Sequence, residues 1–370
     1  MKKKVLFTAT VDSHIKNFHL PYLKYFKDNG YEVHVATNGK DKIPHCDVKH
    51  TVSFERSPFR VNNLKARKQL KKIIDSEGFE IIHTHTPMGS VITRLAALKA
   101  RKAQKTRVIY TAHGFHFYKG APIQNWILYY PVEKFLARYT DTLITINKED
   151  YQRAKNKFKT RVEYVPGVGL DEKKFDFKMT KKEKSELRKS LGLKDTDYVL
   201  MCVAELNKNK NQKLLIDAMS EVVKKNKDIH LLLVGIDSYN GKHKRQATKL
   251  GLEGNVHFLG FRKDVPRLLK ISDLAISSSL REGLPMNLLE ALYSGVPVLA
   301  TQCRGNSDLS RYVDLVKVVA LNESNSFKYQ IILKYKKQNK QDYKYSTEGL
   351  GIYSLASVLN KIELIYGNRL

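Results

Sequence analysis

The chain has 370 residues, of which 42% are hydrophobic, and its formal net charge is +29. This length is more than one hydrophobic core usually serves, and the apolar fraction excludes wholesale disorder, so two domains are expected. The positive charge favours anionic partners such as phospholipid, nucleic acid or phosphorylated substrates, although a compositional bias towards lysine explains it equally well.

The first half of the chain alternates short apolar runs with amphipathic segments. The runs predict strands at 3–10, 31–37, 79–86, 107–113 and 142–147, and the segments between them predict helices at 16–29, about 62–77, about 88–101 and about 123–139. Asn29-Gly30 is a stop signal for the first helix. This alternation predicts a parallel, doubly wound sheet.

The second half repeats the pattern, with strands predicted at 198–205, 229–235, 256–260, 274–279 and 297–301, and helices at about 210–225, 240–250, 264–271 and 285–294. A Pro- and Gly-containing segment, 162–175, marks the boundary between the halves. We therefore expect an α/β protein with two Rossmann-like domains, 1–172 and 173–345, and a closing helix within 346–370. Ligands are expected beyond the carboxyl ends of the strands, in the cleft between the domains.

Cysteine usage and hydropathy bear on the compartment. The chain has three cysteines, Cys46, Cys202 and Cys303. Their spacing is not that of metal ligands and their number is not that of a complete disulfide set, which fits a reducing cytoplasm. No apolar run approaches the ~18 residues of a membrane span. The apolar part of the N-terminal sequence MKKKVLFTAT is too short for the core of a signal peptide. We expect a cytoplasmic protein.

The stretch SSLREGLPMNLLEALYSGVPVLAT (278–301) carries two glutamates beside a predicted strand end. Pro285 suits a first helical position, and the free N–H groups of a helix start form a ready anion site. Glu282 projects from the loop and Glu290 from inside the helix, a layout that suits the sugar and the ribose of a nucleotide sugar. Alternatively, Glu282 complements the helix dipole and Glu290 is a surface residue.

The segment EGLPMNLLEALYSGVPVLAT resembles the signature of family 4 retaining glycosyltransferases, which have the GT-B architecture of two Rossmann-like domains. Two glutamates separated by seven residues and then Gly-x-Pro-Val form this signature. Similar segments lie at 83–97, 110–120, 203–219 and 258–279, and the resemblance weakens after about residue 309.

The resemblance implies roles for individual residues. Glu290 should bind the nucleotide ribose, and Glu282 should sit beside the transferred sugar. The backbone of Gly283 and Leu284 should meet sugar and phosphate, and Lys210 matches the phosphate-binding lysine of the family.

One donor-side position departs from the family. Where the family usually has an arginine, five residues before Lys210, this chain has Glu205. A carboxylate cannot donate a hydrogen bond to phosphate, so Lys208 or Arg262 would have to supply the second charge.

Histidines at strand ends form a second set of candidates. The resemblance makes His113 a sugar-contacting residue near the reaction centre, with His116 a weaker neighbour. His83 and His85 alternate on one strand and could suggest a metal pair, but without a third ligand we expect cleft or core histidines. Asp195-Thr196-Asp197 has the spelling of a metal-binding Asp-x-Asp motif, but we expect an ordinary turn.

Acceptor contacts are sought on the N-terminal side. Asp12, His14 and Lys16 follow the first strand and are assigned to the acceptor, although a simple turn and helix start explains them nearly as well. The segment 115–139 holds the only tryptophan, Trp126, among aromatic and basic residues. It is interpreted either as a surface that touches the inner leaflet or as an ordinary core helix kinked at Pro131.

The resemblance implies transfer of a hexosyl or N-acetylhexosaminyl group from a nucleotide sugar, foremost a UDP-sugar, without metal or cofactor. The expected acceptor is a polyprenyl-diphosphate-linked glycan at the inner face of the plasma membrane, in bacterial capsule or exopolysaccharide synthesis. Three alternatives stay open: a nucleotide-sugar epimerase, a degenerate or regulatory GT-B protein, and a basic nucleic-acid-binding protein. The lysine-rich segment 328–346 suggests the last, but a solvated helix is expected there and no nucleic-acid partner.

Overall fold

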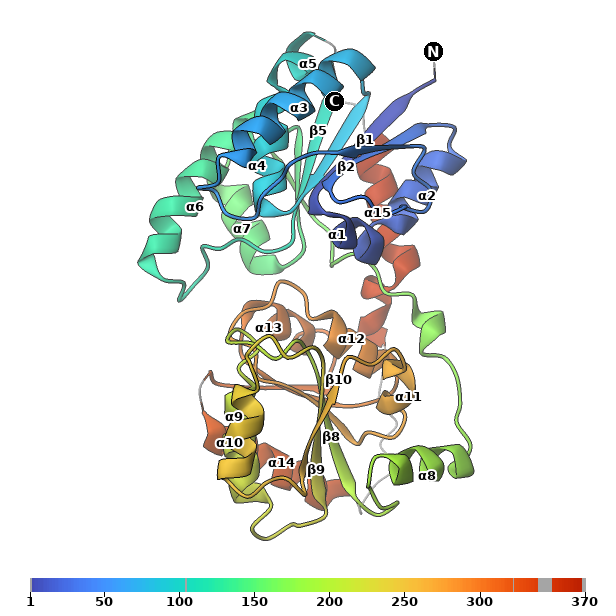
Figure 1. Ribbon diagram of the computed structural model, residues 1–370, viewed down its shortest axis with the longest axis vertical. Helices are drawn as coiled ribbons and strands as arrows, with labels where there is room; N and C mark the ends of the chain where they lie inside the picture. The colour runs from blue at the N-terminus through green and yellow to red at the C-terminus, as the bar shows by residue number, and fades with distance from the viewer. Residues whose placement is uncertain (1, 104, 322, 339–347, 368–370) are drawn as a thin grey trace. The chain divides into compact units, whose positions relative to one another are not determined.

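The computed structural model describes residues 2–103, 105–321, 323–338 and 348–367 (Figure 1). The chain forms two compact units, Met1–Val168 with Val358–Leu370, and Gly169–Ser357. Each unit has a wholly parallel sheet flanked by helices, which confirms the predicted α/β class. The boundary lies between Val168 and Gly169, four residues before the expected one.

The first unit is built on a seven-stranded sheet of order β3-β2-β1-β4-β5-β6-β7. Its central strands form because their apolar runs are buried on both faces, as parallel sheets require. The two edge strands, β3 and β7, were not predicted, since they are short and half-exposed. The strands are β1 (Lys4–Val11), β2 (Glu32–Asn38), β3 (Val48–Thr51), β4 (Ile81–His85), β5 (Arg107–Ala112), β6 (Thr142–Thr145) and β7 (Arg161–Tyr164).

The helices of the first unit connect these strands. They are α1 (Asp12–Phe18), α2 (Leu20–Asp28), α3 (Asn62–Glu77), α4 (Pro87–Ala96), α5 (Leu98–Ala103), α6 (Ile123–Leu136) and α7 (Lys148–Lys157). The single helix expected at 16–29 is wrong, because α1 ends and α2 begins around His19. Pro21, in the first turn of α2, cannot donate to the preceding turn, which favours this break. His19 is thereby turned into the unit's interior.

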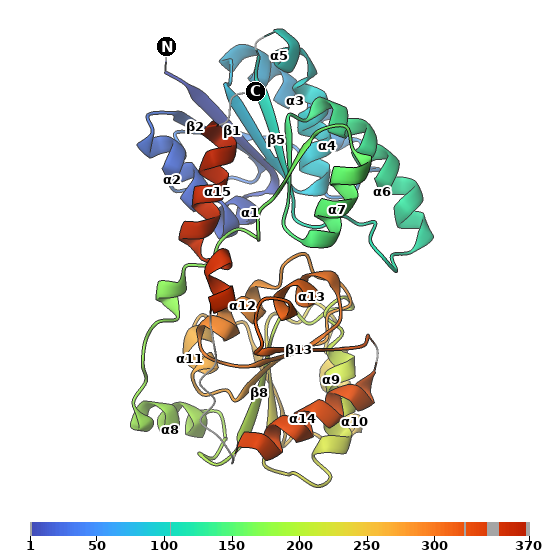
Figure 2. The same ribbon diagram turned by 180° about the vertical axis from the view of Figure 1, so that it is seen from behind.

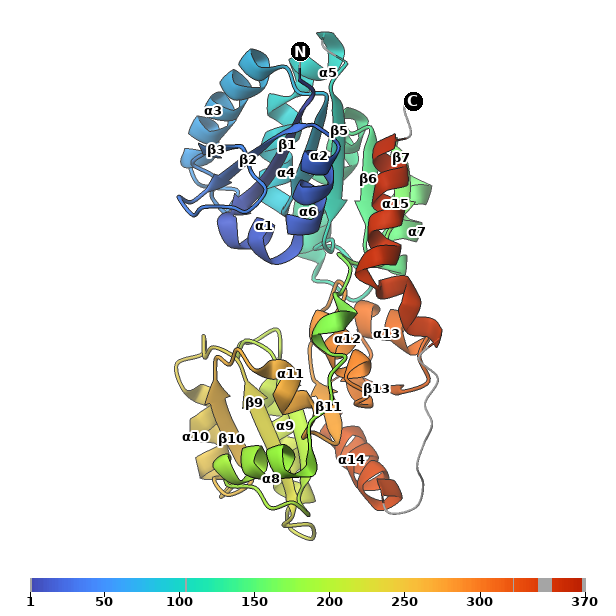
Figure 3. The same ribbon diagram turned by 90° about the vertical axis from the view of Figure 1, so that its right-hand side faces the viewer.

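The final helix, α15 (Leu355–Gly367), completes the core of the first unit (Figures 2 and 3). Its Val358, Ile362 and Tyr366 are at most 5% exposed. Arg107 donates from Nη1 to the Tyr366 carbonyl at 2.6 Å and from Nη2 to the Ile365 carbonyl at 2.8 Å. The predicted closing helix started too early: Glu348–Tyr353 is a 3-10 helix of the second unit, and 346–347 lie outside the described residues.

The second unit has a six-stranded sheet of order β10-β9-β8-β11-β12-β13. Its strands are β8 (Tyr198–Val203), β9 (Ile229–Val234), β10 (Val256–Gly260), β11 (Leu274–Ser277), β12 (Val298–Thr301) and β13 (Val316–Val319). Its helices are α8 (Lys181–Ser190), α9 (Gln212–Val222), α10 (Lys242–Lys249), α11 (Val265–Leu269), α12 (Met286–Tyr293), α13 (Arg304–Ser310) and α14 (Ser324–Gln338).

The segment after the signature is ordered as part of this sheet. β13 pairs in parallel with β12 and forms the sheet's edge. α14 buries Phe327 and Ile331 against the core, and Tyr335 donates to Asp228 at 2.6 Å. The expectation of a purely solvated helix at 328–346 is therefore wrong for its first part, and 339–346 lie outside the described residues.

Candidate functional site

Three loops converge at the carboxyl end of the second unit's sheet. They follow β8, β11 and β12, of which β11 lies between the other two, and they carry Lys210, Glu282 and Arg304. Lys210 Nζ lies 2.6 Å from Glu282 Oε1, with side-chain exposures of 23% and 11%. Arg304 Nε donates to the Glu282 carbonyl at 3.1 Å. Lys210 thus pairs with the carboxylate of the predicted sugar-side glutamate in a partly buried setting, where charges interact more strongly than in water, while Arg304 contacts the backbone carbonyl of the same residue.

Hydrogen bonds within the loop after β8, and between it and the loop after β11, hold Lys210 in place. The Asn207 side chain accepts from the Lys210 N–H at 3.0 Å, and Ser278 Oγ donates to the Lys210 carbonyl at 2.8 Å. Asn209 Nδ2 donates to the Arg281 carbonyl at 3.1 Å. The backbone of Lys210 is therefore held in one conformation, which suits a side chain that must bind a negative charge at a defined position.

The loop at Gly283 and Leu284 leads into the start of α12. The helix begins at Met286 with Pro285 as its N-cap, one residue later than predicted. Gly305 packs tightly beneath this loop, because a Cβ there would lie 2.6 Å from the Gly283 carbonyl oxygen. A larger residue at 305 would push the loop away from the helix start.

Glu290 lies half-buried on α12. Burial raises the pKa of its carboxyl group from 4.5 to about 7, an effect that the charge of Lys174 partly offsets. Among the described residues, no side chain or backbone group donates a hydrogen bond to this carboxylate. A desolvated carboxylate with free acceptor capacity suits the recognition of a ligand's hydroxyl groups.

The remaining donor-side candidates are less well placed. Glu205 is exposed, and its carbonyl accepts from Gln212 Nε2 at 3.0 Å. Arg262 is held by both carboxylate oxygens of Asp264, at 2.8 and 2.6 Å. Arg304, which the sequence analysis missed, supplies the second cation beside Glu282; it lies three residues after a strand end, a position that by itself does not mark a site residue. The ligand contacts of these residues stay predictions.

The segment Asp195-Thr196-Asp197 is confirmed as part of a turn. Asp197 Oδ2 accepts from the Lys194 N–H at 2.7 Å and lies 3.3 Å from His230 Nε2. Asp197 is only 5% exposed, so its carboxylate serves the turn before β8.

Histidines gather at the carboxyl end of the first unit's sheet. His14 Nε2 lies 3.2 Å from His113 Nε2, which lies 3.5 Å from His85 Nδ1. The ring of His19 stacks on that of His85, with centroids 3.7 Å apart. Burial lowers the pKa of His14 to about 4 and that of His85 and His113 well below the usual range. These imidazoles are therefore neutral near pH 7.

The predicted pair His83 and His85 is divided between two environments. His83 is hydrogen-bonded through both ring nitrogens, to Tyr366 Oη at 2.7 Å and to Thr111 Oγ1 at 2.8 Å. His85 instead joins His14, His19 and His113. His83 is thus a satisfied core residue, one of the two settings expected for this pair.

The three acceptor-side candidates separate in the structure. Asp12 is 5% exposed, and its carboxylate accepts from Thr37 Oγ1, from the Asp41 N–H at 2.9 Å, and pairs with Lys49 at 3.0 Å. Lys16 pairs with Asp41 at the surface, at 3.0 Å. Asp12 therefore positions the loop that follows β2, while His14 lines a pocket. The acceptor contacts of all three residues stay predictions.

That pocket has a volume of about 650 Å³ and lies entirely within the first unit. Its lining is largely apolar, and it includes Phe59, Leu128 and Val132, which are 82%, 52% and 42% exposed. Arg56 and His14 are among its polar lining residues. The pocket thus joins apolar surface to groups able to meet a phosphate.

Helix α6 is not the ordinary core helix that one interpretation of the segment 115–139 expected. Ile123, Ile127 and Phe135 are 50% exposed or more, so most of its apolar residues do not pack in the core. Trp126, by contrast, packs against Phe117, at 5.7 Å between ring centroids, and under Arg153. The exposed surface is therefore mainly aliphatic, with one phenylalanine, and the tryptophan helps to hold the helix.

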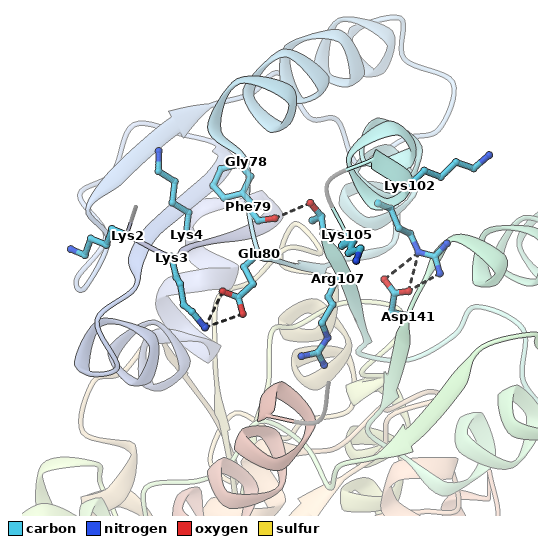
Figure 4. A pocket seen from close by; sticks show the side chains of 12 residues that line it. Lys2, Lys3, Lys4, Gly78, Phe79, Glu80, Lys102, Lys105, Arg107 and Asp141 are labelled. Carbon is cyan, nitrogen blue, oxygen red and sulfur yellow. Dashed lines mark hydrogen bonds and ion pairs between the residues drawn. The ribbon is translucent and has the colours of Figure 1, made fainter. Parts of the chain in front are cut away.

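A second pocket, of about 770 Å³, lies at the amino ends of strands of the first unit's sheet (Figure 4). Glu80 and Asp141 in it pair with Lys3 at 3.3 Å and with Arg101 at 2.6 Å. Seven basic residues line it in all: Lys2, Lys3, Lys4, Arg101, Lys102, Lys105 and Arg107. Part of the chain's net charge is thus concentrated here, apart from every predicted site residue.

Comparison with known proteins adds a family to this geometry. Residues 4–147 match the model described as "Glycosyl transferase 4-like", and residues 183–340 match "Glycosyl transferases group 1". The "Putative glycosyltransferase EpsD" of Bacillus subtilis (strain 168) is 44% identical over 339 residues, 91% of this chain and 88% of EpsD.

Two further similarities cover most of the chain. An Escherichia coli protein named UDP-Gal:α-D-GlcNAc-diphosphoundecaprenol α-1,3-galactosyltransferase is 29% identical over 273 residues, 72% of this chain and 69% of the relative. The crystal structure of Anabaena HepE in complex with UDP and glucose has a TM-score of 0.75, at 20% identity, over 98% of this chain and 99% of HepE. By sequence and by fold, this chain belongs to the family 4 glycosyltransferases of GT-B architecture, and it is a transferase enzyme.

Proposed function

We propose that this enzyme transfers a sugar, with retention of configuration, from a UDP-sugar to a lipid-linked glycan acceptor in the synthesis of a bacterial surface polysaccharide. One observation carries the proposal: Lys210, Glu282 and Arg304 meet at three strand ends, beside the start of a helix that bears the unpaired Glu290. The E. coli relative, whose name specifies UDP-Gal and a diphosphoundecaprenol acceptor, supports the choice of both substrates.

The donor's diphosphate is the charge that this cluster is built to meet. Lys210 and Arg304 are cations, and the first-turn N–H groups of α12 add a positive dipole end. Glu282 neutralises Lys210 at 2.6 Å, and the diphosphate competes for that lysine when the donor binds. Glu282 then has its carboxylate available for hydroxyls of the transferred sugar, and Glu290 for those of the ribose.

In the transfer step, the bond from the sugar's anomeric carbon to the diphosphate oxygen breaks, and a bond to the acceptor hydroxyl oxygen forms on the same face. The leaving phosphate oxygen takes the acceptor's proton, so the products are a nucleoside diphosphate and the extended glycan. The transition state is oxocarbenium-like, and the protein contributes positioning and charge stabilisation. We propose that Lys210 and the helix start stabilise the departing diphosphate without a metal ion on it.

The acceptor's lipid is assigned to the apolar pocket of the first unit. Phe59, Leu128 and Val132 present apolar surface in and around it, and Arg56 and His14 supply groups for a diphosphate. No helix among the described residues is long and apolar enough to span a bilayer. We propose that the exposed aliphatic face of α6 touches the inner leaflet, so that the prenyl chain enters the pocket from the membrane.

Two measurements test the proposal. Isothermal titration with UDP, GDP and ADP should give binding of UDP alone, weakened at least about tenfold by Glu290→Ala. Incubation with UDP-sugars and an undecaprenyl-diphosphate glycan should then release UDP only when the acceptor is present. Release without acceptor would indicate an epimerase, binding of GDP or ADP instead would refute the UDP assignment, and binding of no nucleotide would indicate a degenerate transferase.

A further inference from the structure

Four histidines from three strand ends of the first unit converge on one point. His14 and His19 follow β1, His85 ends β4 and His113 follows β5, and one ring nitrogen of each lies within 4.8 Å of the others. β4 lies between β1 and β5 in the sheet. We infer that the first unit binds one divalent transition-metal ion through His14, His85 and His113, with His19 within reach as a fourth ligand. This inference goes beyond the proposed function. It involves none of the donor-side cluster of Lys210, Glu282 and Arg304, but it shares His113 with the expected sugar contact and His14 with the proposed acceptor pocket.

The distances between the nitrogens suit a shared ion. With metal–nitrogen bonds of about 2.0–2.1 Å, two ligands of a tetrahedral site lie roughly 3.3 Å apart. His113 Nε2 lies 3.2 Å from His14 Nε2 and 3.5 Å from His85 Nδ1, on either side of that value. Small side-chain movements would therefore bring all three nitrogens to bonding distance of one ion.

Hydrogen bonds alone do not satisfy this cluster. A single nitrogen of a neutral imidazole either donates or accepts, so His113 Nε2 can form at most one good hydrogen bond with its two neighbours. Both nitrogens of His19 are buried without a partner among the described residues. Each such group carries a desolvation cost, and His83, with both nitrogens bonded, shows what a purely structural histidine in this unit looks like.

His19 must turn to become a ligand. Its ring stacks on that of His85 at 3.7 Å between centroids and an interplanar angle of 24°, and two nearly parallel rings cannot both direct a lone pair at one ion. His14 also lines the apolar pocket, so a bound ion is accessible to solvent or to a ligand from that side. An open position of this kind accepts a water molecule or an anionic oxygen.

The donor set selects the class of ion. Imidazole nitrogens suit Zn²⁺, Co²⁺, Ni²⁺ and Cu²⁺, whereas Mg²⁺ and Ca²⁺ require oxygen ligands. No carboxylate oxygen belongs to the cluster among the described residues. The four positions gave no motif in the sequence, because the sheet topology, and not their spacing along the chain, brings them together.

The test uses untagged full-length protein, freed of metal by a chelator and dialysed. Titration with Zn²⁺ should give one site per chain, and excess Mg²⁺ should not displace the bound Zn²⁺. Titration with Co²⁺ should give the intense visible absorption of a four-coordinate site. His113→Asn and His14→Asn should each weaken Zn²⁺ binding more than about 100-fold, because loss of even an outer partner of a ligand costs 10–100-fold.

The pair His230 and His257 supplies the matched control. These rings lie in the second unit with Nδ1 and Nε2 3.0 Å apart, so His257→Asn removes an equally close histidine contact outside the cluster. It should leave Zn²⁺ binding unchanged. Circular dichroism must show that every variant is folded. Wild type without a one-to-one site, binding that survives both cluster substitutions, or binding lost in His257→Asn would each overturn the inference, whatever the nucleotide titrations show.

Discussion

Glu290→Gln should stabilise the protein and weaken its nucleotide site at the same time. The folded state raises the pKa of this carboxyl from 4.5 to about 7, so it holds the proton more tightly than the unfolded chain does. The ionised group therefore costs nothing below pH 4.5, costs increasingly as the pH rises towards 7, and costs a constant amount above it. Each pKa unit corresponds to about 1.36 kcal/mol, so ionisation of Glu290 lowers the free energy of unfolding by at most about 3 kcal/mol near pH 8.

Glutamine keeps the shape of the side chain and removes the charge. Urea unfolding near pH 8 should show a free energy of unfolding raised by up to about 3 kcal/mol in the variant, and nearly no change below about pH 4.5. Circular dichroism is the appropriate signal, because the only tryptophan, Trp126, lies in the other unit. Exposed Glu253 gives the control: Glu253→Gln should leave stability unchanged at both pH values.

The binding measurement has the opposite sign. Affinity for UDP should fall about 10- to 100-fold in Glu290→Gln, the worth of a hydrogen bond to a charged group. In wild type the affinity should rise as the pH increases through about 7, while in the variant it should stay flat. Equal stability of variant and wild type near pH 8, or unchanged UDP binding, would refute the reasoning that this carboxylate is kept unpaired for a ligand.

Three further changes test neighbouring features. Lys210→Met should lower kcat about 100-fold, because it removes a charge from the departing diphosphate, whereas Lys213→Met, which breaks only an exposed pair, should not; steady-state assays decide. Gly305→Ala should weaken UDP binding in calorimetry by displacing the Gly283 loop, whereas the control Gly254→Ala, whose added methyl group meets open space, should not. A normal affinity of Gly305→Ala for UDP would count against the tight contact. Leu128→Asp, at a side chain 52% exposed on α6, should abolish flotation with phosphatidylglycerol vesicles, and full flotation would exclude this face from the membrane contact.

Apolar runs predicted the central strands of both sheets, because burial on both faces leaves a continuous signal in the sequence. The edge strand Arg161–Tyr164 carries two charges in four residues and gave no such signal. The break at His19 was also missed, since the apolar periodicity continues across it into α2.

The site was predicted in part. Lys210 and Glu282 were identified one at a time from motif positions, and only the adjacency of β8 and β11 brings them within 2.6 Å. Arg304 and the histidine cluster could not be predicted, because their neighbours come from other strand ends and the pairing of strands is not written in local spacing. The partners of Asp12 could not be predicted either, because a carboxylate at a strand end looks the same in sequence whether it faces solvent or its own loop.

The contribution of α15 to the first unit has a consequence for biosynthesis. Val358, Ile362 and Tyr366 fill an apolar face formed by residues such as Tyr22 and Phe26. The ribosome completes the second unit, Gly169–Ser357, before these residues emerge. During that interval the apolar side chains of the first unit that pack against α15 in the finished protein lack this partner. Arg107, which holds the Ile365 and Tyr366 carbonyls, then secures the helix once it has docked.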